Sequence, residues 1–299
     1  PWPECFGKLD HDTVTYILDK EETQKAGERA ITKWIWPKDK RKDLWLEYNR
    51  RFLTLRKIAK EIDLLSGEIN EKELKSKARY YYDTFQSFWS LVLVPEIANY
   101  GAPDFLKKKL SLYIPQKDIA SALQALLAPE KMSFHNRCDY ELYKIVLSSH
   151  SHEDLKQKID KHAKKWYWVD SSYLEISHVT SEDFKKRIFL MTKIQAKKKI
   201  KNIENHYKEV ARKKRELQIA YKIPHDIMDL ANALSFSIWW QDHRKGILWW
   251  MYSKIDKVSK IVCKKYNISF DKFLYYTSDE WIELIEKKKK ISQIIIQKR

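Results

Sequence analysis

Residues 224–266 read PHDIMDLANALSFSIWWQDHRKGILWWMYSKIDKVSKIVCKKY, and this stretch decides the fold. Its apolar residues recur at steps of three and four positions, at Ile227, Leu230, Leu234, Ile238, Leu248, Tyr252, Ile255 and Val262. That spacing predicts one long helix that begins after Pro224 and ends near Tyr266. Ser181 is expected to open another long helix that ends near Tyr221, so the two segments are predicted to form an antiparallel hairpin.

Two more long helices are expected nearer the N-terminus. The 3.6-residue period begins at Lys38 and runs along one face until Gly67, which is expected to end the helix. Residues 71–100 form the second predicted helix, with a kink at Pro95 and an end at Gly101. Shorter helices are expected between Pro103, Pro115 and Pro129. Residues 167–180 lack the helical period and are predicted to be a loop.

Both ends of the chain differ from this helical pattern. Residues 13–18 (TVTYIL) read as a strand, followed by a helix that Asp19 caps and Pro37 stops. Residues 291–296 (ISQIII) also read as a strand, one with no partner nearby in sequence. We therefore expect a mostly α fold, a helical array with long antiparallel helix hairpins and a short N-terminal strand-helix piece.

Three parts are expected along the chain. Residues 1–36 would be a strand-helix remnant of a preceding domain, residues 37–290 the central helical domain, and residues 291–299 the first strand of a following domain. The lysine run at 287–290 is the expected boundary before the last part. This organisation indicates a fragment of a longer polypeptide.

Composition excludes several classes of protein. The 299 residues carry a net charge of +17, mostly from lysine, which favours solvated charged faces over a dedicated site for polyanions. The 5 glycines are too far apart for a phosphate-binding loop. The 3 cysteines have no metal-ligand spacing and are expected to be reduced thiols, which indicates a cytoplasmic protein. No apolar run is long enough to span a bilayer, so no membrane partner is expected.

The central part of the 224–266 helix carries the first candidate site. Polar and indole side chains interrupt its apolar stripe, at Trp239, Trp240, Gln241, Asp242, Arg244 and Lys245, here called the 239–245 cluster. Polar groups on a face turned to the core must find partners or face a cavity. The cluster is therefore either a substrate-binding pocket, in which the indoles stack and the charges orient a ligand, or a buried ion-pair network that sets the register of the helix.

A second candidate is the run KKWYW at 164–168. Indoles such as Trp166 and Trp168 between lysines can stack on a ligand's rings while the ammonium groups hold phosphates. The same pattern is more typical of rings packed in the core beneath extended lysine side chains. No catalytic residue and no metal ligand set is predicted, because the dispersed histidines lack the spacing of known metal motifs.

Several segments resemble one family in order and spacing across residues 80–285. They are FWSL at 88–91 with VPE at 94–96, LLAPE at 126–130 with SF at 133–134, KHAKKWYW at 161–168, IWWQDHRK at 238–245 and YYTSDE at 275–280. Together they resemble the central helical region of the phosphoenolpyruvate synthase-like phosphotransferases, which include the pyruvate phosphate dikinases and rifampicin phosphotransferase. The family pattern leads us to expect an acidic or small polar residue at position 243, and His243 departs from it.

The resemblance implies a transferase of the kinase type whose catalytic parts lie elsewhere. Such enzymes have an ATP-grasp domain first and a swivelling phosphohistidine domain last, and the histidine carries a phosphoryl group from ATP to an acceptor. The chain would then be the central linker and acceptor-binding region, without a catalytic centre of its own. Its partners would be those two domains of the same polypeptide and a small-molecule phosphoryl acceptor. ATP and magnesium would bind in the full-length enzyme and not in this segment.

Two other functions remain open. One is a basic helical module that binds nucleic acid through the lysines of residues 193–222. Because Lys197, Lys198, Lys199 and Lys201 are nearly consecutive, they spread around a helix axis, which disfavours a specific nucleic-acid site. The other is a purely structural spacer that binds no ligand.

Overall fold

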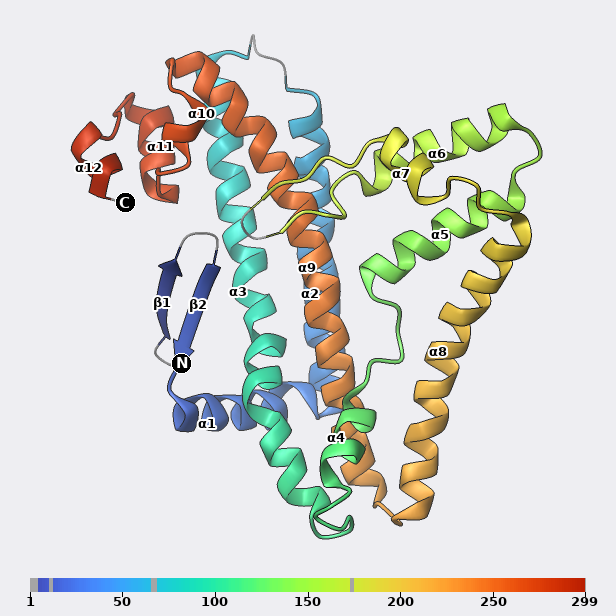
Figure 1. Ribbon diagram of the computed structural model, residues 1–299. Coiled ribbons are helices and arrows are strands. Elements are labelled where there is room, and N and C mark those ends of the chain that lie inside the picture. Colours follow the sequence, from blue (N-terminus) through green and yellow to red (C-terminus); the bar gives the residue numbers. More distant parts are fainter. Residues whose placement is uncertain (1–4, 11–12, 66–68, 173–174, 299) are drawn as a thin grey trace. The chain divides into compact units, whose positions relative to one another are not determined.

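The computed structural model describes residues 5–10, 13–65, 69–172 and 175–298. The fold is mostly α, as predicted. The N-terminal elements are β1 (Cys5–Asp10), β2 (Thr13–Leu18), α1 (Lys20–Ala30) and the π-helix η1 (Ile31–Ile35). The long helices are α2 (Lys38–Asp63), α3 (Glu71–Leu110), α8 (Lys193–Ala220) and α9 (His225–Tyr266). The shorter helices are α4 (Ile119–Leu127), α5 (Phe134–Ser148), α6 (His152–Trp166), α7 (Ser181–Arg187), α10 (Phe270–Phe273), α11 (Ser278–Lys287) and α12 (Gln293–Lys298) (Figure 1).

The predicted N-terminal strand and helix are confirmed. β2 pairs with β1 as an antiparallel hairpin in which Cys5 lies opposite Leu18, and β1 is a strand that the sequence pattern did not reveal. Asp19 caps α1, since its carboxylate accepts a hydrogen bond of 2.8 Å from the backbone N–H of Glu22. The side-chain oxygen satisfies one of the backbone donors that a helix start leaves open.

The chain divides into two compact units, which are described separately. The first unit comprises Pro1–Trp45 and Val92–Trp249, and the second comprises Leu46–Leu91 and Trp250–Arg299. The predicted parts at 1–36, 37–290 and 291–299 stay a prediction.

In the first unit, α8 packs along α5 and against α4, while α6 packs against α5 and α7. Buried Cys138, Leu142 and Val146 form one face of α5. The hairpin predicted between α8 and α9 stays a prediction. Lys214 Nζ on α8 donates a hydrogen bond of 2.8 Å to Ser235 Oγ on α9.

The prediction that Gly101 ends a helix is wrong, because α3 continues through Pro95, Gly101 and Pro103 to Leu110. Gly101 instead lies at a close approach to α1. A Cβ atom at Gly101 would lie 2.1 Å from the carbonyl oxygen of Thr23, and one at Gly27 would lie 2.4 Å from the Cα of Gly101. The two glycines let the backbones of α1 and α3 meet, so their role is in packing and not in ending a helix.

The single helix predicted to begin at Ser181 and end near Tyr221 is also wrong. α7 ends at Arg187, Leu190 has a φ of 60°, and α8 begins at Lys193. Thr192 starts α8 with a capping box, in which its hydroxyl and the side chain of Gln195 each bond the other's backbone N–H. The hydrogen bonds of the capping box satisfy backbone N–H groups at the start of α8, which offsets helical hydrogen bonds lost at the break between α7 and α8.

In the second unit, the ring of Tyr48 on α2 packs against Phe88 on α3, with centroids 5.2 Å apart. Lys254 on α9 lies 2.6 Å from the carboxylate of Asp63. α9 has the predicted length. Gly67, the predicted end of the helix that begins at Lys38, lies outside the described residues.

The strand predicted at 291–299 is wrong where the structure describes it, because α12 forms there. The backbone N–H groups of Ile295 and Ile296 both donate to the carbonyl of Ser292. Local helical hydrogen bonds therefore satisfy these groups. Among the described residues, no helix combines the length and the apolar character needed to cross a membrane.

Gly101→Ala should destabilise the protein by about 2 kcal/mol or more, because the new methyl group meets backbone atoms that no rotamer change can move. Chemical denaturation followed by circular dichroism measures the change. Lys107→Ala, at an exposed position of the same helix, is the control and should change stability by less than about 0.5 kcal/mol. Equal effects of the two substitutions would contradict the close approach.

Candidate functional site

The 239–245 cluster lies in the part of α9 that belongs to the first unit, which ends at Trp249. Trp240 and Arg244 have no exposed surface, and the other members of the cluster are half-buried. The prediction that this stretch of helix faces the interior is therefore confirmed. Whether the cluster binds a substrate stays a prediction.

Glu96 on α3 is the centre of the polar contacts around the cluster. Its Oε2 forms an ion pair with Nη1 of Arg244, and its side chain is only 14% exposed. Its Oε1 lies 3.4 Å from Nε2 of Gln241, whose own oxygen accepts a hydrogen bond of 3.1 Å from Asn99. Ser237 donates a hydrogen bond of 3.0 Å to the carbonyl of Pro95. We call these contacts the Glu96 network, and it joins α3 to α9 within the first unit.

Asp242 has a partner that its sequence position did not indicate. The carboxylate accepts a hydrogen bond of 3.0 Å from the backbone N–H of Phe134, more than 100 positions earlier in the chain. Burial raises the pKa of Asp242, and this hydrogen bond and the nearby positive charges oppose that rise. Asp242 thus fixes the first residue of α5 against α9.

The indole faces of the cluster pack against groups of the same chain. Trp239 donates a hydrogen bond of 3.0 Å to the carbonyl of Met132, and the ammonium of Lys131 lies 4.3 Å from its ring centroid. The ring of Trp45 packs at 5.5 Å from Trp239 and 5.3 Å from Trp240. The protein itself therefore provides the stacking and cation contacts that a ligand would need.

The second candidate pair is also packed in the core. Trp166 and Trp168 are 5% and 8% exposed, and their rings lie 5.3 Å apart. Trp166 donates to Glu141 at 2.8 Å, and Trp168 donates to the carbonyl of Lys165 at 2.9 Å. The ring of Trp168 also lies 5.8 Å from that of Phe134. Phe134 is thus the residue that connects both candidate sets.

A buried lysine was not predicted from the sequence. The side chain of Lys214 on α8 is only 4% exposed, lies 3.1 Å from Glu130 and donates to Ser235 at 2.8 Å. Burial lowers its pKa, and the pairing with Glu130 opposes that shift. Ser235 in turn donates to the carbonyl of Ala128 at 2.8 Å. The one signal of this burial in the sequence is that Lys214 follows Val210 by four positions, so both residues lie on the same, buried face of α8.

Cys138 and His162 lie close enough to resemble a nucleophilic pair, with 3.5 Å between Sγ and Nε2. Burial raises the pKa of Cys138 to about 12, whereas a nucleophilic thiol needs a pKa below its usual value. Burial also lowers the pKa of His162 to about 4. Both groups are therefore neutral at pH 7, and the pair belongs to the core. Nowhere in the described part of the chain do three or more histidine, cysteine, aspartate or glutamate side chains converge as a metal site would require.

Comparison with known proteins gives no relative for this arrangement. The chain matches no model of a known protein family, no curated protein and no solved structure.

Glu96→Gln should destabilise the fold by about 3–5 kcal/mol, because it removes the negative charge that forms an ion pair with the fully buried guanidinium of Arg244. Denaturant unfolding measures the loss. Glu209→Gln is the matched control, since Glu209 pairs with Arg212 on the exposed face of α8 and should contribute less than about 1 kcal/mol.

The double variant Glu96→Gln/Arg244→Met also removes the buried positive charge and should recover part of the lost stability. A loss as small as that of Glu209→Gln would contradict the importance of this ion pair.

Acid should destabilise the protein between pH 6.5 and 4, because burial lowers the pKa of both His162 and His243 to about 4. Below pH 6.5 the unfolded chain binds protons at these positions and the folded chain does not, so each histidine removes up to about 1.4 kcal/mol per pH unit. Calorimetric melting at pH 7, 6 and 5 measures the effect. His162→Phe should reduce this sensitivity, whereas His206→Phe at an exposed position should not. Equal acid sensitivity in both variants would contradict the burial argument.

Proposed function

We propose that this chain is the central helical region of a phosphotransferase similar to phosphoenolpyruvate synthase, in which it holds the catalytic domains in place. One observation supports the proposal most. The segments that carry the resemblance are far apart in sequence, yet four of the five contact one another in the first unit. Glu96 pairs with Arg244, Phe134 bonds Asp242, and Trp168 packs on Phe134. Such convergence is expected when recurring motifs encode a shared packing arrangement.

The LLAPE segment joins the same set of contacts. The carbonyl of Ala128 accepts a hydrogen bond from Ser235, and Glu130 pairs with the buried Lys214. Since these groups are bonded to each other, the contacts favour a scaffold role over an acceptor pocket at the 239–245 cluster. A small-molecule acceptor is therefore proposed to meet the phosphohistidine domain elsewhere.

ATP and magnesium are proposed to bind in the ATP-grasp domain of the full-length polypeptide. Two observations support this: the 5 glycines of the sequence are too far apart for a phosphate-binding loop, and no three carboxylate, histidine or cysteine side chains converge as a metal site among the described residues. A cytoplasmic location is part of the proposal, since ATP is available there and Cys138 and Cys263 are free thiols.

The lysines of α8 do not favour the nucleic-acid alternative. Lys214 is buried against Glu130, whereas Lys197, Lys198 and Lys199 are exposed at consecutive positions and so point in different directions. A phosphate-binding stripe would need such lysines on one exposed face.

The product of the complete reading frame, incubated with ATP labelled at the γ-phosphate, should acquire an acid-labile phosphohistidine outside residues 1–299. The isolated chain should take up no label, and calorimetric titration with magnesium-ATP should detect no binding in the micromolar range. Limited proteolysis and mass spectrometry locate the label. Label within residues 1–299, micromolar ATP binding, or a reading frame without an ATP-grasp and a phosphohistidine segment would each contradict the proposal.

A further inference from the structure

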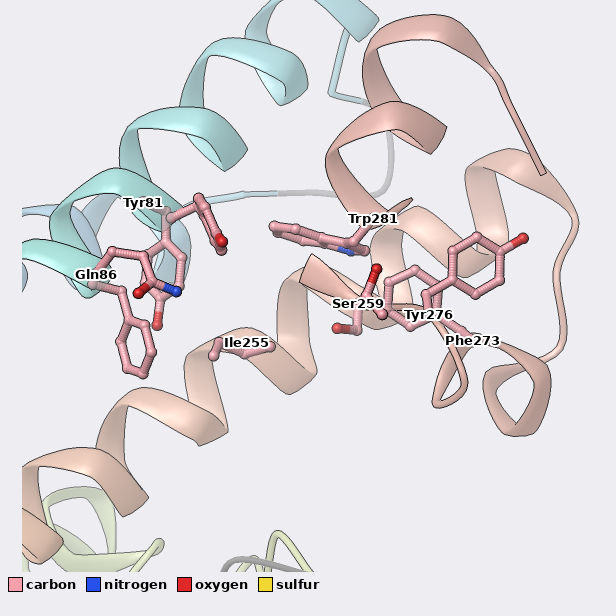
Figure 2. Close-up of a pocket in the computed structure, with 10 residues that line it drawn as sticks. Tyr81, Gln86, Ile255, Ser259, Phe273, Tyr276 and Trp281 are labelled. Atoms are coloured by element: carbon pink, nitrogen blue, oxygen red, sulfur yellow. The ribbon is translucent and has the colours of Figure 1, made fainter. Parts of the chain in front are cut away.

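The second unit contains an aromatic cavity of about 170 Å³ between α3, α9 and the α10–α11 region. Figure 2 shows Tyr81 and Gln86 of α3 on one side, Phe273 and Tyr276 on the other, and Ile255 of α9 along the base. Among the described residues that line this cavity, none is acidic or basic, so the cavity selects no ligand by charge. A surface whose chemistry does select a partner lies in the first unit.

The connection between α7 and α8 exposes three large apolar side chains within six residues (Figure 1). Phe189 is 76% exposed, Leu190 is 81% exposed, and Ile194, in the first turn of α8, is 82% exposed. Single apolar residues are common at protein surfaces, whereas several together indicate contact with an apolar partner. We call these three residues the α7–α8 tip.

Buried residues and hydrogen bonds on both sides define the turn that carries the α7–α8 tip. Ile188, directly before it, is buried, and the carbonyl of Ile188 accepts a hydrogen bond of 2.9 Å from the backbone N–H of Met191. The capping box of Thr192 then starts α8, and Ala196 of the first turns is buried. Since these anchors point inward, the side chains of the tip are left outside.

Leu190 lies at a position where leucine is unfavourable for folding. Its φ of 60° is in the left-handed region, which glycine and asparagine adopt more readily than a residue with a branched apolar side chain. The exposed side chain adds almost nothing to the core. A contact outside the chain explains an apolar side chain at this position better than the fold of the chain does.

The α7–α8 tip is surrounded by positive charge. Residues 185–201 contain eight lysines and arginines and no acidic residue. Three of these cations form ion pairs with acids outside this range, namely Lys185 with Glu182, Lys186 with Asp183 and Arg187 with Asp170. Four others are exposed and form no ion pair with a described residue, namely Lys193, Lys197, Lys198 and Lys201. The tip therefore combines apolar side chains with uncompensated positive charge.

An anionic lipid bilayer offers both kinds of contact at once. Apolar side chains enter the interface between headgroups and acyl chains, while lysines beside them stay among the negatively charged headgroups. Lys197 and Lys198 follow Ile194 by three and four positions, which places them within about 6 Å of it along the helix axis. That spacing is inside the Debye length of about 8 Å at physiological ionic strength, so these charges act where the tip would enter.

A nucleic acid fits this surface less well. It would use the charges but would leave the side chains of Leu190 and Ile194 in water. A nucleic acid also needs its lysines in one line, whereas a bilayer presents negative charge as an extended plane, so lysines that spread around the start of α8 can all contribute.

We propose that the α7–α8 tip docks on the surface of an anionic phospholipid bilayer, with Phe189, Leu190 and Ile194 in the interface and the neighbouring lysines at the headgroups. This proposal does not rest on the phosphotransferase role, because it uses only residues 185–201. Docking of this kind also differs from the spanning segment whose absence led us to expect no membrane partner.

Cosedimentation of the full chain with vesicles of phosphatidylserine and phosphatidylcholine in equal amounts tests the proposal. Leu190→Asn should weaken binding at least about five-fold, because it removes one apolar side chain from the interface. Its melting temperature should be unchanged or raised, since asparagine adopts the left-handed conformation more readily. Ile219→Asn, at an equally exposed position at the other end of α8, should change vesicle binding by less than about two-fold.

A second pair of variants tests the charges. Lys193→Gln/Lys198→Gln should weaken binding at least about ten-fold, because each lysine near an anionic surface contributes about five-fold. Lys107→Gln/Lys108→Gln makes the same change of net charge at exposed positions of α3 and should change binding by less than about two-fold.

An environment-sensitive fluorophore distinguishes insertion from loose electrostatic attachment. The nitrobenzoxadiazole fluorophore is attached to Leu190→Cys in a chain that also carries Cys5→Ser, since Cys138 and Cys263 are buried. Its emission should shift to shorter wavelength when the anionic vesicles are added. The same fluorophore at Ile219→Cys should show no shift.

Four results would overturn the proposal. They are equal vesicle affinity of the unchanged chain and folded Leu190→Asn, an unshifted fluorophore at position 190, tighter binding to single-stranded DNA than to vesicles at equal phosphate concentration, and self-association of the chain that Leu190→Asn abolishes. The last two would assign the surface to a nucleic acid or to a second copy of the chain. If Leu190→Asn does not fold, Ile194→Gln, at an exposed helical position, must weaken vesicle binding at least about three-fold.

Discussion

The ion pair between Arg244 and Glu96 constrains the first unit, because Arg244 has no exposed surface and its charge needs a fixed counter-charge. A guanidinium removed from water loses several kcal/mol of hydration, so its counter-charge must be held in place. Glu96 directly follows Pro95, whose carbonyl accepts from Ser237 on the same helix as Arg244. The ion pair and this hydrogen bond together set how α3 and α9 are aligned within the unit. Given that alignment, Asp242 faces the start of α5 and positions Phe134.

Local signals were enough to predict the elements that depend on neighbouring residues. The apolar steps of α9 predicted its length, and Asp19 predicted the start of α1, since periodicity and caps act within a few residues. Gly101 and the break before Thr192 were misread for the opposite reason. Whether a glycine ends a helix or lies at a helix crossing depends on a partner, here Gly27, that is remote in sequence. Likewise, residues 291–296 have strand composition, but Gln293–Lys298 forms the helix α12.

The candidate sites show the same limit. The sequence located the 239–245 cluster because polar side chains interrupted an apolar stripe, but it could not identify Glu96 or Trp45 as their partners. The aromatic cavity of the second unit was not predicted, although YYYDTF at 80–85 and the segment YYTSDEW at 275–281 are conspicuously rich in rings. Ring-rich segments usually form solid core, and only the folded structure shows that these leave a cavity.

Because Gly27 and Gly101 are in contact, the residues allowed at these two positions, which are distant in sequence, depend on each other. A side chain at either position would strike the backbone of the opposite helix, so neither position can accept a larger residue unless the helices move apart. In any descendant that keeps this crossing, glycine is expected at both positions. The pair is therefore a sequence marker of the fold that does not depend on the motifs around residues 239–245, and it can identify distant relatives in which those motifs have diverged.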